Sequence, residues 1–266
     1  MPLLVIDLSH WNTVKSLQTV ANAGLVGVIH KASEGDGYVD PTYADRREEA
    51  LRAGLCWGAY HFGTSADVDD QVNNFLAAAD PDDETLVALD LEDYEQNSMG
   101  LDAAEEFVEK VEEALGRPLG CVLYSGNRIK ELVPEPSVFW GSRRLWLAHY
   151  CSPPPELPTS WDRYFLWQYT DRAQVDGIEG PVDGNEYAGT PAELRAAWSP
   201  RFEPDEPVVE GDDVSVTVAR ETTTTTSVEV ERGCDDEEEK RPVHPARGRS
   251  RPARRSATKA KKKGRK

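Results

Sequence analysis

The sequence contains few cysteines and shows no pattern typical of a metal site. Its 266 residues include four cysteines, Cys56, Cys121, Cys151 and Cys234, and no two of them have CxxC spacing. This distribution favours buried free thiols over disulfides or thiolate ligands. The five histidines also lack the pairwise spacing typical of zinc ligands, so no metal site is expected.

Long apolar segments are absent as well. No stretch is long and apolar enough to cross a membrane, so insertion into a membrane is not expected. The chain starts with Met1-Pro2 and continues directly into a short apolar strand, without the basic region and cleavage site of a signal peptide. These absences predict a protein that is made in the cytoplasm.

Composition and charge change near Pro200. Residues 201–239 are acidic and rich in threonine, and residues 240–266 hold 13 of the 30 Lys and Arg residues with no Asp or Glu. Residues 1–239 therefore carry 17 basic against 48 acidic residues, a formal net charge of −31. Dense blocks of one charge are typical of solvated interaction tails. We expect a folded domain at residues 1–200, an acidic linker or small hairpin at 201–239, and a disordered basic tail at 240–266.

Within the first 200 residues, short apolar strands alternate with helix-like stretches. Strands are expected at Leu3–Leu8, Gly27–Lys31, Cys56–Phe62, Leu86–Glu92, Gly120–Tyr124, Leu145–His149, Phe165–Tyr169 and Pro181–Val182. Helices are expected at Val14–Ala23, Pro41–Ala53, Val68–Ala79 and Leu101–Leu115. This alternation predicts an α/β fold with a parallel sheet, closed into an irregular TIM-like (β/α) barrel with its active site at the carboxyl ends of the strands.

The fourth expected strand ends in two acids, Asp90 and Glu92, whose side chains share one face because they are two residues apart. Paired carboxylates hydrolyse glycosidic bonds, although strand-end acids are also common without such a role. Taken singly, residues such as Tyr60 or Trp146 are more often core residues. The other strand ends together carry acids, amides and aromatic rings that suit a sugar-binding groove: Asp7, Ser9, His30, Lys31, Glu34, Tyr60, His61, Tyr124, Ser125, Trp146, His149, Trp167, Gln168, Asp183 and Asn185.

A series of short blocks links these positions: Asp7-Leu-Ser9, His30-Lys-Ala-Ser-Glu-Gly35, Tyr38-Val-Asp-Pro41, Gly58-Ala-Tyr-His-Phe62, Leu89-Asp-Leu-Glu92, Trp167-Gln-Tyr169 and Val182-Asp-Gly-Asn185. Their order and spacing over residues 3–190 resemble glycoside hydrolase family 25, the lysozymes (N-acetylmuramidases) of bacteria, fungi and bacteriophages. One segment departs from the family, which often has Gln a few residues after the first Asp-x-Ser where this chain has His10-Trp11-Asn12.

The resemblance implies an enzyme that hydrolyses the β-1,4 bond between N-acetylmuramic acid and N-acetylglucosamine in peptidoglycan, by a retaining or substrate-assisted route and without a cofactor. The family's catalytic acids map onto Asp7, Asp90, Glu92 and Asp183. Glu92 is the implied general acid, and Asp90 the residue that orients the substrate acetamido group. Substrate-binding positions are implied at Tyr60, His61, Lys31, Glu34, Tyr124, Trp146, Trp167 and Gln168.

The expected cellular role is that of a monomeric bacteriophage endolysin, made in the host cytoplasm and released to the cell wall. The alternative is a catalytically silent peptidoglycan-binding or virion structural component. Retention of all four acids argues against this alternative, because a binding module does not need a protonated acid.

The basic tail at residues 240–266 is expected to bind anionic wall polymers through its charge. Nucleic acid is not expected as the main partner, because residues 1–239 are strongly acidic and contain no base-reading motif. A second hypothesis is that the tail folds back against the acidic block at Asp235–Glu239.

Overall fold

The computed structural model describes residues 3–150 and 156–198. Within these residues no helix has the length and apolar character that a membrane span requires. Cys56 and Cys121 are free thiols, as the sequence indicates, and Cys121 is buried. The other two cysteines and the expected linker, hairpin and tail lie outside the described residues.

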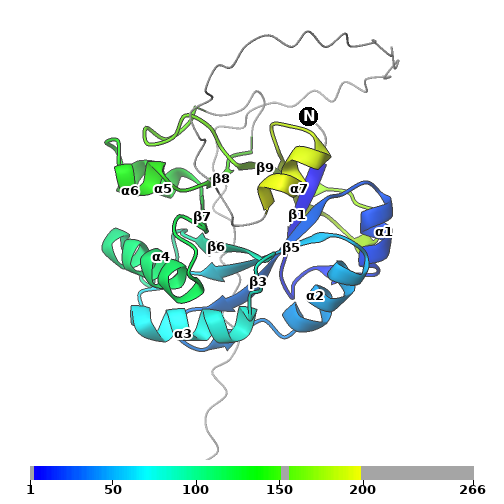
Figure 1. The fold of residues 1–266 in the computed structure, drawn as a ribbon, viewed down its shortest axis with the longest axis horizontal. Coiled ribbons are helices and arrows are strands. Elements are labelled where there is room, and N and C mark those ends of the chain that lie inside the picture. Colours follow the sequence, from blue (N-terminus) through cyan, green and yellow to red (C-terminus); the bar gives the residue numbers. More distant parts are fainter. Residues whose placement is uncertain (1–2, 151–155, 199–266) are drawn as a thin grey trace, which may run out of the picture. The chain divides into compact units, whose positions relative to one another are not determined.

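Eight strands close into a barrel (Figure 1). Around the ring they are β1 (Leu3–Leu8), β11 (Val182–Glu186), β9 (Leu166–Ala173), β8 (Leu145–Ala148), β7 (Cys121–Ser125), β6 (Leu86–Asp90), β5 (Cys56–Phe62) and β3 (Gly27–Glu34), which pairs with β1. All pairs are parallel except those that β11 makes with β1 and β9. The predicted irregular α/β barrel is confirmed.

The direction of β11 differs from the expected all-parallel barrel. Residues 174–181 join β9 to β11, and this connection is shorter than the dozen or so residues that a parallel crossover needs. The strand therefore runs back antiparallel, and its amino end lies where the other strands have their carboxyl ends. Asp183 consequently pairs with Asp7 in the sheet.

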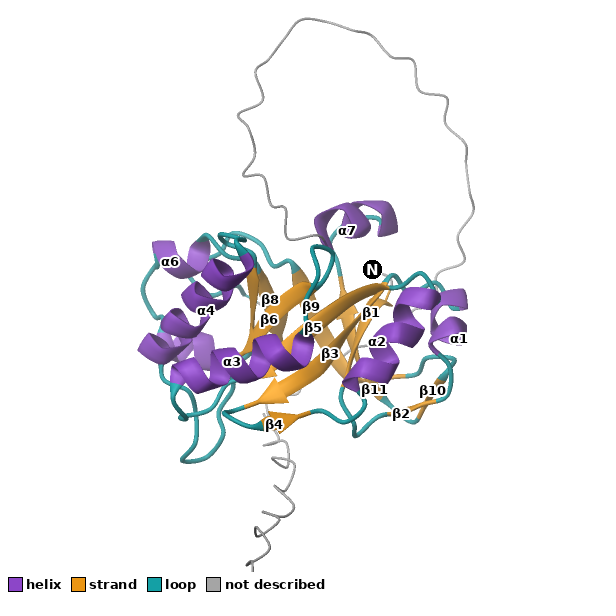
Figure 2. Cartoon of the chain, turned by 60° about the horizontal axis from the view of Figure 1, so that its bottom comes forward, coloured by secondary structure: helices purple, strands orange, loops and turns teal. Residues whose placement is uncertain are grey.

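The helices lie around the outside of the barrel (Figure 2). They are α1 (Leu17–Asn22), α2 (Tyr43–Arg52), α3 (Val68–Ala79), α4 (Leu101–Leu115), α5 (Asn127–Leu132) and α6 (Val138–Gly141). Helix α1 starts later than predicted because Ser16 caps it, and residues Thr13–Val14 form β2, which pairs with β10 (Ile178–Glu179). Helix α4 ends at Leu115 and is capped by Gly116, which has a φ of +63°, a conformation that glycine adopts without strain.

Side-chain alternation along the strands creates two apolar layers. Outward residues such as Leu89 pack under the helices, whereas inward residues such as Val122 and Trp146 fill the barrel. Helix α7 (Pro191–Trp198) closes one end, where the Trp198 indole donates a hydrogen bond of 2.8 Å to the Trp57 carbonyl. The short strand β4 (Tyr38–Val39) lies at the opposite end, so the strand-end polar groups face away from α7 (Figure 2).

Candidate active site

The four predicted acids converge at the end of the barrel opposite α7. Asp7 and Asp90 are buried near the carboxyl ends of β1 and β6, and Glu92 and Asp183 are half-buried, just after β6 and at the start of β11. The charges of Asp7 and Glu92 both act on Asp183, and those of Asp7, Asp90 and Asp183 act on the Tyr60 hydroxyl. Three of the four acids thus lie close enough to Tyr60 to act on its hydroxyl, and Glu92 joins them through its effect on Asp183.

Two amide side chains hold the carboxyl group of Asp7. Gln168 Nε2 and Asn185 Nδ2 each donate a hydrogen bond of 2.9 Å to Asp7 Oδ2. The amide oxygens accept from the Tyr124 hydroxyl at 3.0 Å and from the Trp146 indole at 2.6 Å, respectively. These second contacts fix which way each amide faces, so Asp7 is held by a rigid network that spans five strands.

Burial raises the pKa of Asp183, and the neighbouring charges of Asp7, Asp171 and Glu92 raise it further. A hydrogen bond with Asp7 also favours the protonated form. Two adjacent carboxyl groups in a buried site commonly share one proton, because both cannot be ionised at low cost. Asp183 therefore keeps its proton at neutral pH.

We expect Asp183→Asn to stabilise the protein at neutral and alkaline pH. The folded pKa of Asp183, about 9, lies above its unfolded value, so this group stabilises the fold below about pH 4 and this contribution is lost as the pH rises towards 9. Asparagine has no ionisable group, so the variant does not show this loss of stability with rising pH. Its free energy of unfolding should exceed the wild-type value at pH 8 by at least about 1.4 kcal/mol, the equivalent of one pKa unit.

Thermal unfolding of both proteins between pH 4 and pH 9 measures this difference. The exposed Asp176, changed to Asn, is the matched control and should follow the wild-type curve. Parallel curves for Asp183→Asn and wild type would show that Asp183 is ionised in the folded protein.

Several predicted substrate-binding residues also lie at this end of the barrel. Lys31 lies on the inward face of β3 and is paired in the sheet with Tyr60 of β5. Its ammonium lies 2.5 Å from Glu34 Oε2 and 4.7 Å from the Phe62 ring centroid. Tyr124 is buried and acts through its hydrogen bond to Gln168. Lys31 therefore lies beside Tyr60, and Tyr124 supports the amide that holds Asp7.

The structure does not bring His61 together with them. Because His61 follows the inward-facing Tyr60, its side chain points outwards and is fully buried beneath the helices. Its ring atoms lie 2.8 Å from Ser33 Oγ and 3.2 Å from Gln71 Oε1, and the ring stacks on Phe107. Burial lowers the pKa of His61 to about 4, so the ring is neutral and structural.

Two tryptophans predicted to bind substrate are instead buried and position neighbouring residues through hydrogen bonds. Trp167 is buried, and its indole donates a hydrogen bond of 2.7 Å to the His149 carbonyl, which ties β9 to the end of β8. Trp146 is also buried, with its ring edge-on to Tyr124 and its indole bonded to Asn185. Because both rings are buried, neither exposes a face on which a sugar could stack.

Two residues outside the predicted catalytic and substrate-binding sets also contribute. Asn185, which the sequence placed among the strand-end residues, holds Asp7, and Tyr150, which the sequence prediction did not select, donates a hydrogen bond of 2.9 Å to Gln168 Oε1. Tyr150 lies at an even spacing from the inward-facing Trp146 and Ala148, and this alternation was the signal that pointed to it.

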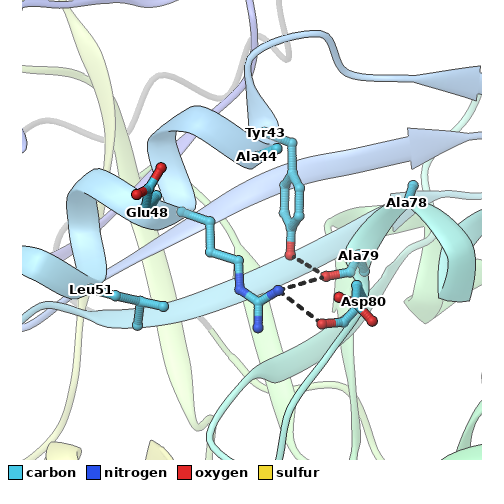
Figure 3. Close-up of a pocket in the computed structure, with 8 residues that line it drawn as sticks. Tyr43, Ala44, Glu48, Leu51, Ala78, Ala79 and Asp80 are labelled. Atoms are coloured by element: carbon cyan, nitrogen blue, oxygen red, sulfur yellow. Dashed lines mark hydrogen bonds between the residues drawn. The ribbon is translucent and has the colours of Figure 1, made fainter.

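A hollow of about 320 Å³ lies elsewhere, between α2 and the end of α3 (Figure 3). The Tyr43 hydroxyl and the Arg47 guanidinium donate to the carbonyls of Ala79 and Asp80 there, at 3.0 Å and 2.8 Å. These contacts satisfy carbonyl groups at the end of α3. The hollow is therefore a junction between helices, separate from the acids.

Within residues 3–150 and 156–198, no group of three or more His, Cys, Asp or Glu side chains is placed to hold a metal ion. The site presents carboxyl groups collected at the strand ends of a closed α/β barrel. This combination of fold and site is typical of a glycoside hydrolase.

The sequence profile of the glycosyl hydrolases family 25 matches residues 6–178, and the chain belongs to this family. It is 33% identical over 204 residues to the uncharacterized protein YegX of Escherichia coli K12, with 72% of this chain and 71% of YegX covered.

Solved structures show the same relationship. The bacterial lysozyme of Streptomyces coelicolor is 25% identical, with a TM-score of 0.67 and coverage of 74% of this chain and 96% of that one. The muramidase of Trichobolus zukalii is 28% identical, with a TM-score of 0.64 and coverage of 73% and 98%.

Proposed function

We propose that the protein is a lysozyme that hydrolyses the β-1,4 bond between N-acetylmuramic acid and N-acetylglucosamine in bacterial peptidoglycan. The observation that carries this proposal is the convergence of four acids at one end of the barrel, with Asp7, Asp90 and Asp183 around Tyr60 and Glu92 near Asp183. Membership of family 25 and the likeness to the bacterial lysozyme of Streptomyces coelicolor and the muramidase of Trichobolus zukalii support it.

In this mechanism Glu92 is the general acid that protonates the leaving glycosidic oxygen. It is half-buried, beyond the end of β6 and close enough to Asp183 to act on it electrostatically. The oxygen of the substrate acetamido group forms a bond to the anomeric carbon as the glycosidic bond breaks. Water then opens this cyclic intermediate and returns a proton to Glu92, so the overall reaction is hydrolysis.

The other acids stabilise positive charge and orient the substrate. Asp90, buried at the end of β6, orients the acetamido group, and Asp7 faces the developing positive charge at the anomeric carbon. The network around Asp7 limits the rearrangement needed during reaction. Burial, together with the charges of Asp90, Asp7 and Asp183, raises the pKa of Tyr60 well above its usual value, so its hydroxyl remains a hydrogen-bond donor.

Product analysis tests the bond that is cut. Wild-type protein is incubated with isolated peptidoglycan, and the soluble fragments are reduced with borohydride and analysed by mass spectrometry. Fragments that end in reduced muramic acid support the proposal, whereas reduced N-acetylglucosamine ends would show that the other glycosidic bond is cut. Sedimentation with the wall without any release would instead identify a binding module.

The finer proposal is that the enzyme serves as a bacteriophage endolysin, a role found among lysozymes of this family. A bacterial culture that expresses the chain should then keep its turbidity until chloroform permeabilises the inner membrane, and clear rapidly afterwards. The inactive Glu92→Gln protein is the control for chloroform itself. Lysis before chloroform is added would contradict this role.

A further inference from the structure

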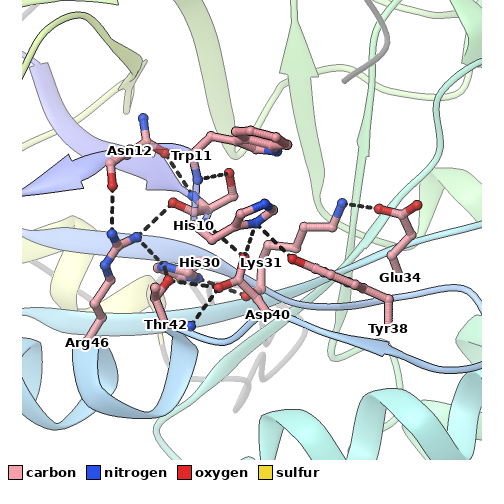
Figure 4. Close-up of polar contacts among 11 residues, drawn as sticks. His10, Trp11, Asn12, His30, Lys31, Glu34, Tyr38, Asp40, Thr42 and Arg46 are labelled. Carbon is pink, nitrogen blue, oxygen red and sulfur yellow. Dashed lines mark hydrogen bonds and ion pairs between the residues drawn. The ribbon is translucent and has the colours of Figure 1, made fainter. Parts of the chain in front are cut away.

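A half-exposed tryptophan follows β1, four residues after Asp7. Trp11 exposes 50% of its surface and Tyr38 exposes 37%, which is high for large aromatic residues of a folded domain. Both rings pack against His10, with centroid distances of 4.5 Å for Trp11 and 5.8 Å for Tyr38 (Figure 4). We name these three residues the aromatic platform.

A buried carboxylate supports the platform. Asp40 Oδ2 accepts a hydrogen bond of 2.8 Å from the His10 backbone and lies 3.0 Å from His10 Nδ1, which is also 2.8 Å from the Tyr38 hydroxyl. Burial alone would raise the pKa of Asp40, but hydrogen bonds from Thr42 and His10 outweigh it and lower the pKa. Asp40 therefore remains ionised and fixes the histidine between the two exposed rings.

An arginine holds the loop that carries Trp11. Arg46 donates hydrogen bonds of 2.7 Å to the Ser9 carbonyl and 2.6 Å to the Asn12 carbonyl, one on each side of Trp11 (Figure 4). It also lies 2.9 Å from Nε2 of the buried His30. A charged group bound at both ends of a short loop restricts its backbone, so the exposed ring is held in position before a ligand arrives.

The platform is continuous with the acid site. Ser9 lies two residues after Asp7, and the Lys31 ammonium lies 5.7 Å from the centroid of the Tyr38 ring. Lys31 is in turn the neighbour of Tyr60 in the sheet. Lys31 therefore links the acid site at Tyr60 to the aromatic platform at Tyr38.

From this geometry we propose that the aromatic platform is a sugar-binding subsite, which holds a ring of the glycan strand outside the pair of sugars that is cleaved. The inference rests on the proposed function. Pyranose rings have apolar C–H faces that pack on exposed aromatic rings, and a polymeric substrate supplies such rings at regular intervals. Asp40 acts as a positioning residue, because it reaches the ligand only through His10.

Binding to glycan strands that lack peptides tests this subsite. The full-length Glu92→Gln protein, which binds without turnover, is titrated calorimetrically with long strands prepared by amidase treatment of peptidoglycan. Adding Trp11→Ala should weaken binding roughly tenfold, as expected when an aromatic anchor is lost. Adding Leu51→Ala, which removes a similarly exposed apolar side chain from α2, should leave binding unchanged.

The possible outcomes separate the two proposals. Unchanged binding in the Trp11→Ala variant overturns the subsite, and weaker binding only to strands that retain their peptides would assign the platform to the stem peptide instead. If the parent Glu92→Gln protein binds no glycan, both the subsite and the muramidase proposal fail. If the wild type cleaves peptidoglycan but Trp11→Ala does not weaken glycan binding in the Glu92→Gln background, only the subsite proposal is rejected and the muramidase proposal stands.

A double-mutant cycle tests the positioning role of Asp40. Asp40→Asn should weaken binding several-fold in the parent protein and have little further effect in the Trp11→Ala background, because both changes act through the same ring. An equal loss in both backgrounds would show that Asp40 acts on the fold in general. Near-ultraviolet circular dichroism confirms that each variant is folded.

Discussion

Glu92→Gln is expected to reduce the rate of peptidoglycan hydrolysis by roughly 1,000-fold, within the range usually contributed by a general acid. The amide keeps the size and hydrogen bonding of the side chain but has no acidic proton for the leaving oxygen. Binding to the wall should change little, because the surrounding network of Asp7 remains intact. Release of reducing ends measures the rate, and co-sedimentation measures binding.

The same loop provides a matched control. Glu95 is exposed and lies three residues after Glu92, so Glu95→Gln makes the same chemical change away from the acid cluster and should retain wild-type activity. With an aryl glycoside as substrate, the difference in rate between Glu92→Gln and the wild type should be smaller, because the leaving group of this substrate needs no proton. If Glu92→Gln retains more than about a tenth of the wild-type rate, a different group protonates the leaving oxygen.

The alternation of side chains along each strand explains how much of this site could be predicted from the sequence. The bounds of β5 agree with the predicted ones, so Tyr60 was assigned to the correct strand end, whereas β6 ends at Asp90, two residues before the predicted end at Glu92. The same alternation separates Tyr60 from His61, which cannot face the barrel interior together. The prediction took both residues because it treated each strand end as a unit, whereas only alternate side chains reach the site.

Other features depend on contacts between distant segments. His10 is 30 residues from Asp40, and nothing in either segment indicates that they meet. The direction of β11 likewise depends on how the chain returns to β1, although the short connection before Val182 was a usable signal. Local sequence patterns were therefore sufficient to predict where the acids lie along the strands. The long-range contacts that position the neighbouring residues could be identified only from the folded structure.

The second large effect concerns stability and a buried ion pair that joins α4 to the start of β8. Arg143 Nε and Nη2 donate to the two carboxylate oxygens of Glu112 at 3.0 Å and 2.8 Å, and Nη1 donates to the Phe139 carbonyl at 2.7 Å. Glu112 Oε1 also accepts a hydrogen bond from the Cys121 backbone. Each charged side chain exposes only 7% of its surface.

Arg143→Ala is expected to lower the free energy of unfolding by about 3–5 kcal/mol, because it leaves the Glu112 carboxylate buried without its partner. Denaturant unfolding at pH 7 measures the change. Lys110→Ala is the control, since Lys110 lies on the same helix but pairs with Glu106 and Asp69 at the surface, where solvent screens the charges. Its unfolding midpoint should match that of the wild type.

Replacing both partners tests whether the loss comes from the unpaired charge. In Glu112→Leu combined with Arg143→Met, neither charge of this pair remains, and such apolar pairs are often as stable as the ion pairs they replace. We therefore expect the double variant to recover most of the stability that Arg143→Ala loses. If it is as unstable as the single variant, the packing of Arg143 against Phe139, at 3.7 Å from the ring centroid, carries the stability instead.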